Sequence, residues 1–258
     1  MTKFTIFKSA AMVLLLAVAI IGCDKSTEVY RGVDSAINIQ MIQRFDNSQP
    51  TLELLFETTT VFPYANYRID LSWQKSSNII DIVFKGVVAM PFPVSNPRTA
   101  IATIDFGTLS NGTYQLNFRK EGVKYSGELI VSYDNYTINF PANPTLNFIN
   151  SPLNKIPKNT IWGFVGYFRE ETLPLVQSFF TALMELGATK RTFTPGYYTG
   201  GFKINKNGDF VFWGRTGFCF VEPFIFHFAG DITDLDELFR QWHYKYGEHL
   251  NIIIYIFK

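Results

Sequence analysis

The pattern of hydrophobic and polar positions changes once along the chain, and so predicts two domains. Between Val33 and Phe140 apolar and polar residues alternate with a period of two; in 67–74 the apolar residues occupy every odd position. Such alternation is typical of half-buried antiparallel strands, and strands at this spacing predict a β-sandwich. The predicted strands are 36–42, 51–56, 67–74, 79–84, 114–119, 128–133 and 136–140.

One short segment of this first domain resembles a known structural corner. Leu109 and Gly112 precede Tyr114, as in the strand-entry corner of immunoglobulin-like and fibronectin-type domains. The resemblance implies that the Tyr114 hydroxyl bonds back to the backbone, and that residues 33–140 form an Ig-like sandwich. An unrelated β-barrel is the alternative that the strand pattern leaves open.

Residues 141–158 have no sustained period and contain four prolines and four asparagines. This composition predicts a semi-rigid interdomain linker, because proline restricts the backbone.

Residues 159–258 predict an α+β domain. An apolar strand precedes a helix that begins near Thr172 and ends at Gly187, and a second helix, capped by Thr233, ends at Gly247. An Asn-Gly turn joins two short strands between the helices. The order β-α-β-β-α-β corresponds to the ferredoxin-like arrangement. The predicted strands are 160–168, 202–205, 210–213 and 251–257, with a further one possible at 217–221.

The strands of this second domain are apolar on both faces, whereas a half-exposed sheet should alternate. We expect the aliphatic positions to meet the helices and the aromatic ones to form the opposite face. A face this apolar should be covered, by the Ig-like domain, the linker or a second copy in a homodimer, unless it is a platform that stacks on sugar rings. The predicted ligand or partner face comprises Trp162, Phe164, Phe168, Trp213, Tyr255 and Phe257, with Phe224, Phe226 and Phe228 as candidate additions.

The N-terminus predicts export and lipid anchoring. Lys3 and Lys8 precede an apolar run at 10–21, which is too short to span a bilayer but suits a signal peptide. The run ends in Ile-Ile-Gly-Cys at 20–23, which resembles the lipobox of bacterial lipoprotein precursors. The resemblance implies that residues 1–22 are removed, that Cys23 is acylated and inserts into the lipid bilayer, and that 23–32 form a tether.

The sequence predicts a location in the cell envelope in general terms. Asp24 resembles an inner-membrane retention signal of some Gram-negative bacteria, but sorting rules differ between lineages, and we favour the outer membrane. Whether the chain faces the periplasm or the cell surface stays open.

Composition excludes several classes of protein. Hydrophobic residues make up 47% of the chain and charged residues 17%, which excludes a disordered chain. The formal charge of +1 argues against a nucleic-acid partner, which requires a basic surface. Without Lys3 and Lys8, 21 of the 23 basic residues remain against 22 acidic ones. With Cys23 acylated, Cys219 has no disulfide partner. No motif or spacing predicts a metal or a cofactor.

Two further stretches are candidates for chemistry. The Gly/Tyr-rich loop 192–201 offers Tyr197, Tyr198, Gly200 and Gly201 as a binding loop. Cys219 and His227 are eight residues apart, about 26 Å along an extended strand, which is too far for a nucleophile and its base.

The sequence therefore predicts an exported, lipid-anchored protein that acts as a non-catalytic binding or assembly module, with a glycan or an envelope protein as ligand. The alternative is an enzyme whose site lies at the domain interface near the 192–201 loop.

Overall fold

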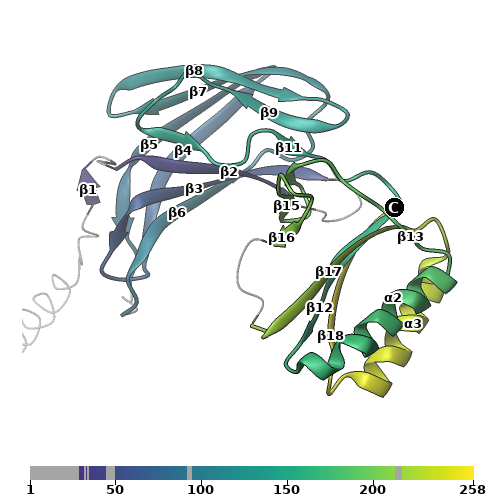
Figure 1. Cartoon of the computed structure of the whole chain (residues 1–258). Helices are drawn as coiled ribbons and strands as arrows, with labels where there is room; N and C mark the ends of the chain where they lie inside the picture. The colour runs from purple at the N-terminus through teal and green to yellow at the C-terminus, as the bar shows by residue number, and fades with distance from the viewer. Residues whose placement is uncertain (1–28, 32, 34, 45–49, 92–94, 213–216) are drawn as a thin grey trace, which may run out of the picture.

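The computed structural model describes residues 29–31, 33, 35–44, 50–91, 95–212 and 217–258. The predicted signal peptide, Cys23 and Trp213 lie outside the described residues. The described part is mostly β, with a large mixed sheet, a small antiparallel sheet and two α-helices (Figure 1). Neither helix among these residues is long and apolar enough to cross a membrane.

The large sheet has fourteen strands, and the order along it is β10-β2-β3-β6-β4-β5-β7-β8-β9-β11-β14-β15-β16, with β1 paired to β5. The strands are β1 (Val29–Arg31), β2 (Ile37–Arg44), β3 (Thr51–Phe62), β4 (Tyr67–Ser76), β5 (Ile79–Ala89), β6 (Arg98–Asp105), β7 (Gly112–Lys120), β8 (Val123–Val131), β9 (Asn135–Asn139), β10 (Leu146–Phe148), β11 (Leu153–Asn154), β14 (Gly196–Tyr198), β15 (Phe202–Ile204) and β16 (Phe210–Phe212).

This sheet bends over itself, so that β7, β8 and β9 form a layer facing β2, β3 and β6 (Figure 1). The two layers meet at Phe56 of β3, whose ring centroid lies 5.5 Å from that of Phe84 and 6.3 Å from that of Phe118. The alternating residues of β2 are buried at every second position, as the period of two predicts. The register of β4 on β5 shifts between Asp70 and Leu71, and an irregularity of this kind bends a strand.

The hydrogen bond that the resemblance implies for Tyr114 is present. The Tyr114 hydroxyl donates to the Ser110 carbonyl at 2.9 Å. The turn around Gly122 joins β7 to β8, which pair in register from Gly112 with Val131 to Lys120 with Val123. The strands β7 and β8 therefore form largely where the sequence predicts them.

The segment predicted as a linker is built into the large sheet. β10 pairs with β2 in parallel, and β11 joins β9 to β14. Between them the Asn150 side-chain amide makes the two hydrogen bonds that a neighbouring strand would make. Its Oδ1 accepts from the Met41 backbone N–H at 2.8 Å, and its Nδ2 donates to the Met41 carbonyl at 2.7 Å. Asn150 is buried, so these bonds satisfy polar groups that water does not reach.

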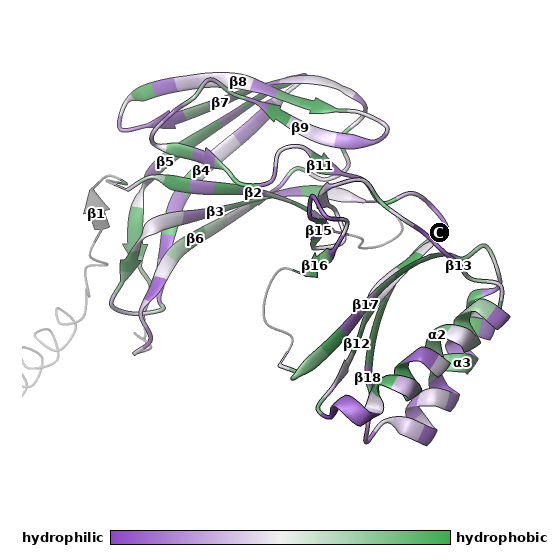
Figure 2. Ribbon diagram, viewed as in Figure 1, coloured by the Kyte–Doolittle hydropathy of each residue, from purple (hydrophilic) through white to green (hydrophobic). Residues whose placement is uncertain are grey.

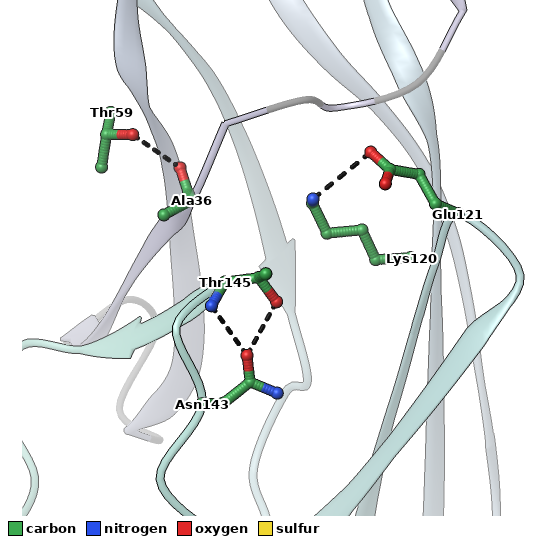
Figure 3. Close-up of polar contacts among 6 residues, drawn as sticks. All are labelled: Ala36, Thr59, Lys120, Glu121, Asn143 and Thr145. Carbon is green, nitrogen blue, oxygen red and sulfur yellow. Dashed lines mark hydrogen bonds and ion pairs between the residues drawn. The ribbon is translucent and has the colours of Figure 1, made fainter.

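Figure 3 shows three sets of polar contacts, one between Thr59 and Ala36 and two between residues close in the sequence. The Ala36 carbonyl accepts from the Thr59 backbone N–H and hydroxyl, at 2.9 and 3.2 Å. Asn143 Oδ1 accepts from both the backbone N–H and the hydroxyl of Thr145. The Lys120 ammonium lies 3.4 Å from Glu121 Oε1, although most of the lysine is buried.

The small sheet has four strands in the order β13-β17-β12-β18, and every neighbouring pair is antiparallel. Along the chain the order is β-α-β-β-α-β. Both helices cover one face of this sheet (Figure 1). Its elements are β12 (Thr160–Tyr167), α2 (Leu173–Glu185), β13 (Thr189–Lys190), β17 (Phe220–His227), α3 (Ile232–Tyr246) and β18 (Asn251–Phe257), with a 3-10 turn (Glu170–Thr172) before α2.

The prediction for this domain names the wrong pair of strands between the two helices. The segments at 202–205 and 210–213 do form a hairpin, β15 and β16, but it belongs to the large sheet. β13 and β17 take the expected places. The reason is that β14 pairs with β11 and extends the edge of the large sheet, and β15 and β16 follow it there.

The two helices differ in how much they bury. In α2, with Pro174 in its first turn, four residues are buried, namely Val176, Phe179, Phe180 and Leu183. In α3 only Leu235 is buried. The side-chain cap of α3 is Asp231, which accepts from the Thr233 N–H at 2.8 Å, rather than the predicted Thr233. Figure 2 shows the mixture of hydrophilic and hydrophobic residues along both helices, as amphipathic helices require.

Replacement of Asn150 tests the built-in linker. Asn150→Ala leaves the buried N–H and carbonyl of Met41 without their partners, and we expect it to lower the free energy of unfolding by about 2–4 kcal/mol. Urea denaturation measures this loss. Asn147→Ala is the matched control, because Asn147 is exposed and bonds only Asn38 at 3.2 Å. An equal, small effect of both variants would contradict the account.

Candidate functional site

The aromatic face of the small sheet is covered by the β14–β16 extension of the large sheet. Trp162 of β12 is buried in a cluster with Ile156, Tyr198, Phe202 and Ile204, and Phe257 packs against it. As predicted, Ile161 and Val165 of the other parity meet the helices. Phe224, Phe226 and Phe228 also lie on the helix side, so their expected membership of the aromatic face is wrong.

The predicted binding loop packs directly over Trp162. The indole Nε1 donates to the Gly200 carbonyl at 3.4 Å. A Cβ atom on Gly200 would lie 2.5 Å from that nitrogen and 2.6 Å from Ile156 Cδ1, which requires glycine here. Tyr198 is buried, and its hydroxyl donates to the Thr194 carbonyl at 2.9 Å. Tyr197 is half-buried against the core of the large sheet, and Gly201 adopts φ +77° in the turn to β15. These four residues contribute packing and a turn.

Stacked rings fill the space beneath this cover. The ring centroids of Tyr198 and Phe202 are 5.2 Å apart, and those of Phe202 and Phe210 are 4.3 Å apart. Phe212 then contacts Phe164 of β12 at 5.0 Å. Offset aromatic pairs of this kind add about 0.5–1.5 kcal/mol each beyond the burial of their area. Trp162 and Phe164 therefore serve as the core between the two sheets.

Only the margins of the aromatic face reach the surface. Tyr255 is 48% exposed and stacks on Trp162 at 5.6 Å. Phe168 is 61% exposed and contacts Phe218 at 5.3 Å. The two lie at separate places on the margin, so the face offers no continuous platform among the described residues.

A pocket of about 260 Å³ lies where the end of the large sheet meets the last strand of the small one. Five segments distant in the sequence form it: the end of β2 with Pro50, the corner at Asn111, the turn between β8 and β9 with Tyr136, the segment that follows β11, and the end of β18. The residues around it are Gln43, Pro50, Asn111, Tyr133, Asp134, Tyr136, Lys155, Ile156, Pro157, Lys158 and Phe257. We call it the junction pocket.

Lys155 is the best-fixed charged group of the junction pocket. Its ammonium donates to the Ser132 carbonyl at 2.6 Å and lies 4.4 Å from the centroid of the Tyr136 ring. Burial lowers the pKa of Lys155, and the nearby Asp134 carboxylate offsets part of this effect. Burial also raises the pKa of the Tyr136 hydroxyl. Lys155 therefore lines the pocket as a cation that is held in place against an aromatic ring.

The remaining polar groups of the junction pocket differ in exposure. Tyr133 is 83% exposed, and Asn111, Asp134 and Lys158 are exposed beside it. Gln43 is buried, and its Oε1 has no hydrogen-bond partner among the described residues.

A metal-ligand group and a Cys219–His227 pair are two arrangements that could carry chemistry, and neither forms in the described part of the chain. No three His, Cys, Asp or Glu side chains there are placed to hold a metal ion. β17 runs unbroken from Phe220 to His227 against β12, so Cys219 and His227 are separated by a whole strand, as the sequence predicts. Cys219 is exposed, with its sulfur in no disulfide.

The sequence reasoning missed the junction pocket, because each of its segments is unremarkable alone. The one signal at hand was the polar turn Tyr133–Asp134 between two strands, which puts an aromatic ring on a surface loop.

No family model matches the chain, and neither do the curated proteins or the solved structures with which it was compared.

Proposed function

We propose that the chain is an exported bacterial lipoprotein that acts as a non-catalytic binding module. The residues at 20–23 support acylation at Cys23, and the composition supports a folded envelope protein. We interpret the large sheet as an Ig-like sandwich extended by β10, β11 and β14–β16; the Tyr114–Ser110 hydrogen bond supports this. We interpret residues 159–258 as a ferredoxin-like domain, for which the strand order β13-β17-β12-β18 is the support.

The junction pocket is the proposed ligand site. The observation that supports this proposal is that an exposed aromatic ring lies beside both hydrogen-bond donors and hydrogen-bond acceptors. The ring of Tyr133 offers a face for stacking, Asn111 and Lys158 offer donors, and Asp134 offers acceptors. A glycan presents flat C–H faces together with hydroxyls that donate and accept, and so matches this set. A volume of about 260 Å³ accommodates one or two sugar units of a longer chain.

We prefer binding to catalysis because Lys155, the charged group held most firmly in the pocket, already has two partners. The Lys155 ammonium is held by the Ser132 carbonyl and the Tyr136 ring, which leaves it poorly placed to act as a nucleophile or base. In the 192–201 loop, near which an enzyme site is the alternative, Phe193 and Tyr198 pack in the cluster around Trp162, and Tyr197 packs against the core of the large sheet.

Replacement of Cys23 tests the anchor. Cys23→Ser removes the sulfur that would carry the acyl chains, so we expect the chain to leave the membrane fraction and to lose palmitate labelling. Fractionation of expressing bacteria with labelled palmitate measures both. Cys219→Ser is the control and should keep the label. Label retained by Cys23→Ser would refute the lipoprotein assignment.

Replacement of Tyr133 tests the ligand site. On a glycan microarray probed with the full chain in detergent, we expect binding to at least one class of glycan. We expect Tyr133→Ala to weaken that binding about tenfold, because the stacking face is lost. Tyr64→Ala, at an exposed tyrosine outside the pocket, should bind as the wild type does. The absence of any bound glycan, or equal binding by Tyr133→Ala, would overturn the proposal.

A further inference from the structure

The small sheet has two edges of opposite character. One edge is β13, which has two residues, both polar: Thr189 and Lys190. The other is β18, which has seven residues, Asn-Ile-Ile-Ile-Tyr-Ile-Phe, and no charge, proline or glycine. Proteins commonly protect an edge strand by making it short, by charging it or by a bulge. β13 shows two of these protections, and β18 shows none.

The geometry of β18 is suited to pairing on its outer side. β18 pairs with β12 over seven consecutive residues without a register shift. No strand in the described ranges pairs with its other side. The end strands of the large sheet, β10 and β16, have only three residues each, so β18 is the long regular edge of the described structure.

An apolar groove runs along the same edge. It has a volume of about 620 Å³ and lies between β18 and α3. Its floor includes Ile252, Ile254 and Ile256, the last of which is 37% exposed. Because only Leu235 of α3 is buried, the helix leaves part of the sheet's apolar face open on this side. A long bare edge and an incompletely covered core therefore coincide.

We propose that two copies of the chain pair through β18, antiparallel about a two-fold axis, to form one continuous eight-stranded sheet. The same axis lays α3 of one copy beside α3 of the other and closes both grooves. Since β13 is protected, each copy has one such edge, and an isologous pair closes at two rather than growing into a polymer.

A second copy fits this surface in both its apolar and its charged parts. Ile252 to Phe257 are all apolar, so antiparallel pairing of β18 with itself opposes apolar residues at every register near its centre. On the rim of the groove, Asp236 lies one helical turn before Arg240 and pairs with it within the helix at 2.5 Å, and His243 lies almost one turn further. With the helices antiparallel, Asp236 of each copy faces Arg240 of the other, so each ion pair gains an opposite charge across the axis.

This surface overlaps the other two only in β18 itself: Phe257 also lines the junction pocket, and Tyr255 and Phe257 belong to the predicted aromatic face. The homodimer predicted from the sequence uses the aromatic face, which β14–β16 cover. The edge of β18 is the alternative that the fold leaves accessible. The dimer does not depend on the proposed glycan binding, because Tyr133 is part of the pocket only.

Light scattering on the full chain in detergent, with the detergent mass subtracted, tests the pairing over a range of protein concentrations. We expect the mass of two copies for the wild type. Ile256→Lys places a charge in the groove and on the edge, and we expect it to weaken dimerisation by about tenfold or more. Tyr244→Lys is the matched control, because Tyr244 is 95% exposed on α3 and outside the groove, and it should remain dimeric.

A second variant keeps the test decisive if Ile256→Lys fails to fold. Arg240→Glu changes an exposed helix position. It removes the ion pair with Asp236 in its own helix and sets acid against acid across the axis, and we expect dimerisation to weaken roughly two- to fivefold. A monomeric wild type at every concentration, an open series of larger species, or a dimer unchanged by both variants would each overturn the proposal.

Discussion

The contact between Trp162 and Gly200 is the one on which the rest of the arrangement depends. Trp162 belongs to the small sheet, and Gly200 belongs to the turn that follows β14 of the large sheet. Their close approach lets β15 and β16 lie over the aromatic face, where the rings of Phe202, Phe210 and Phe212 bury it. Two hydrogen bonds of the neighbouring Thr199 help to fix this turn. Its N–H donates to the Asn154 carbonyl at 2.9 Å, and its hydroxyl accepts from the Ile156 N–H at 3.2 Å.

This arrangement explains two features that the sequence leaves without a reason. A sheet that is apolar on both faces needs two covers, and here the helices provide one and the hairpin extension of the other sheet provides the second. The segment 141–158, for its part, cannot act as a loose linker, because β10, Asn150 and β11 fix it along its length. The junction pocket and the groove beside β18 are the surfaces that remain where these covers end.

Local periodicity predicted most of the elements and little of their association. The alternation at 67–74 and the corner at Tyr114 depend on neighbouring residues, and the strands β4 and β7 form as expected. Membership of a sheet depends on distant partners. Phe202 and Phe210 alternate as any strand would, and nothing within 202–212 shows that β11, about fifty residues earlier, begins the edge they extend. Of the candidate site residues, Trp162 was placed on the correct face, but its cover could not be read from the sequence. Tyr133, Lys155 and Gln43 were missed because only the fold brings them together.

The central claim is that the large sheet covers the small one through the turn at Gly200, and hydrogen exchange of the Gly200→Ala variant tests it most directly. The added methyl group meets the indole and Ile156, so we predict a loss of about 1–3 kcal/mol and a shared loss of protection in β12 and β15. Gly201→Ala, where φ is +77° but the space is open, should cost about 1 kcal/mol of backbone strain and leave β12 protected. If β12 keeps its full protection in Gly200→Ala, the two sheets are not joined at this turn and the account is wrong.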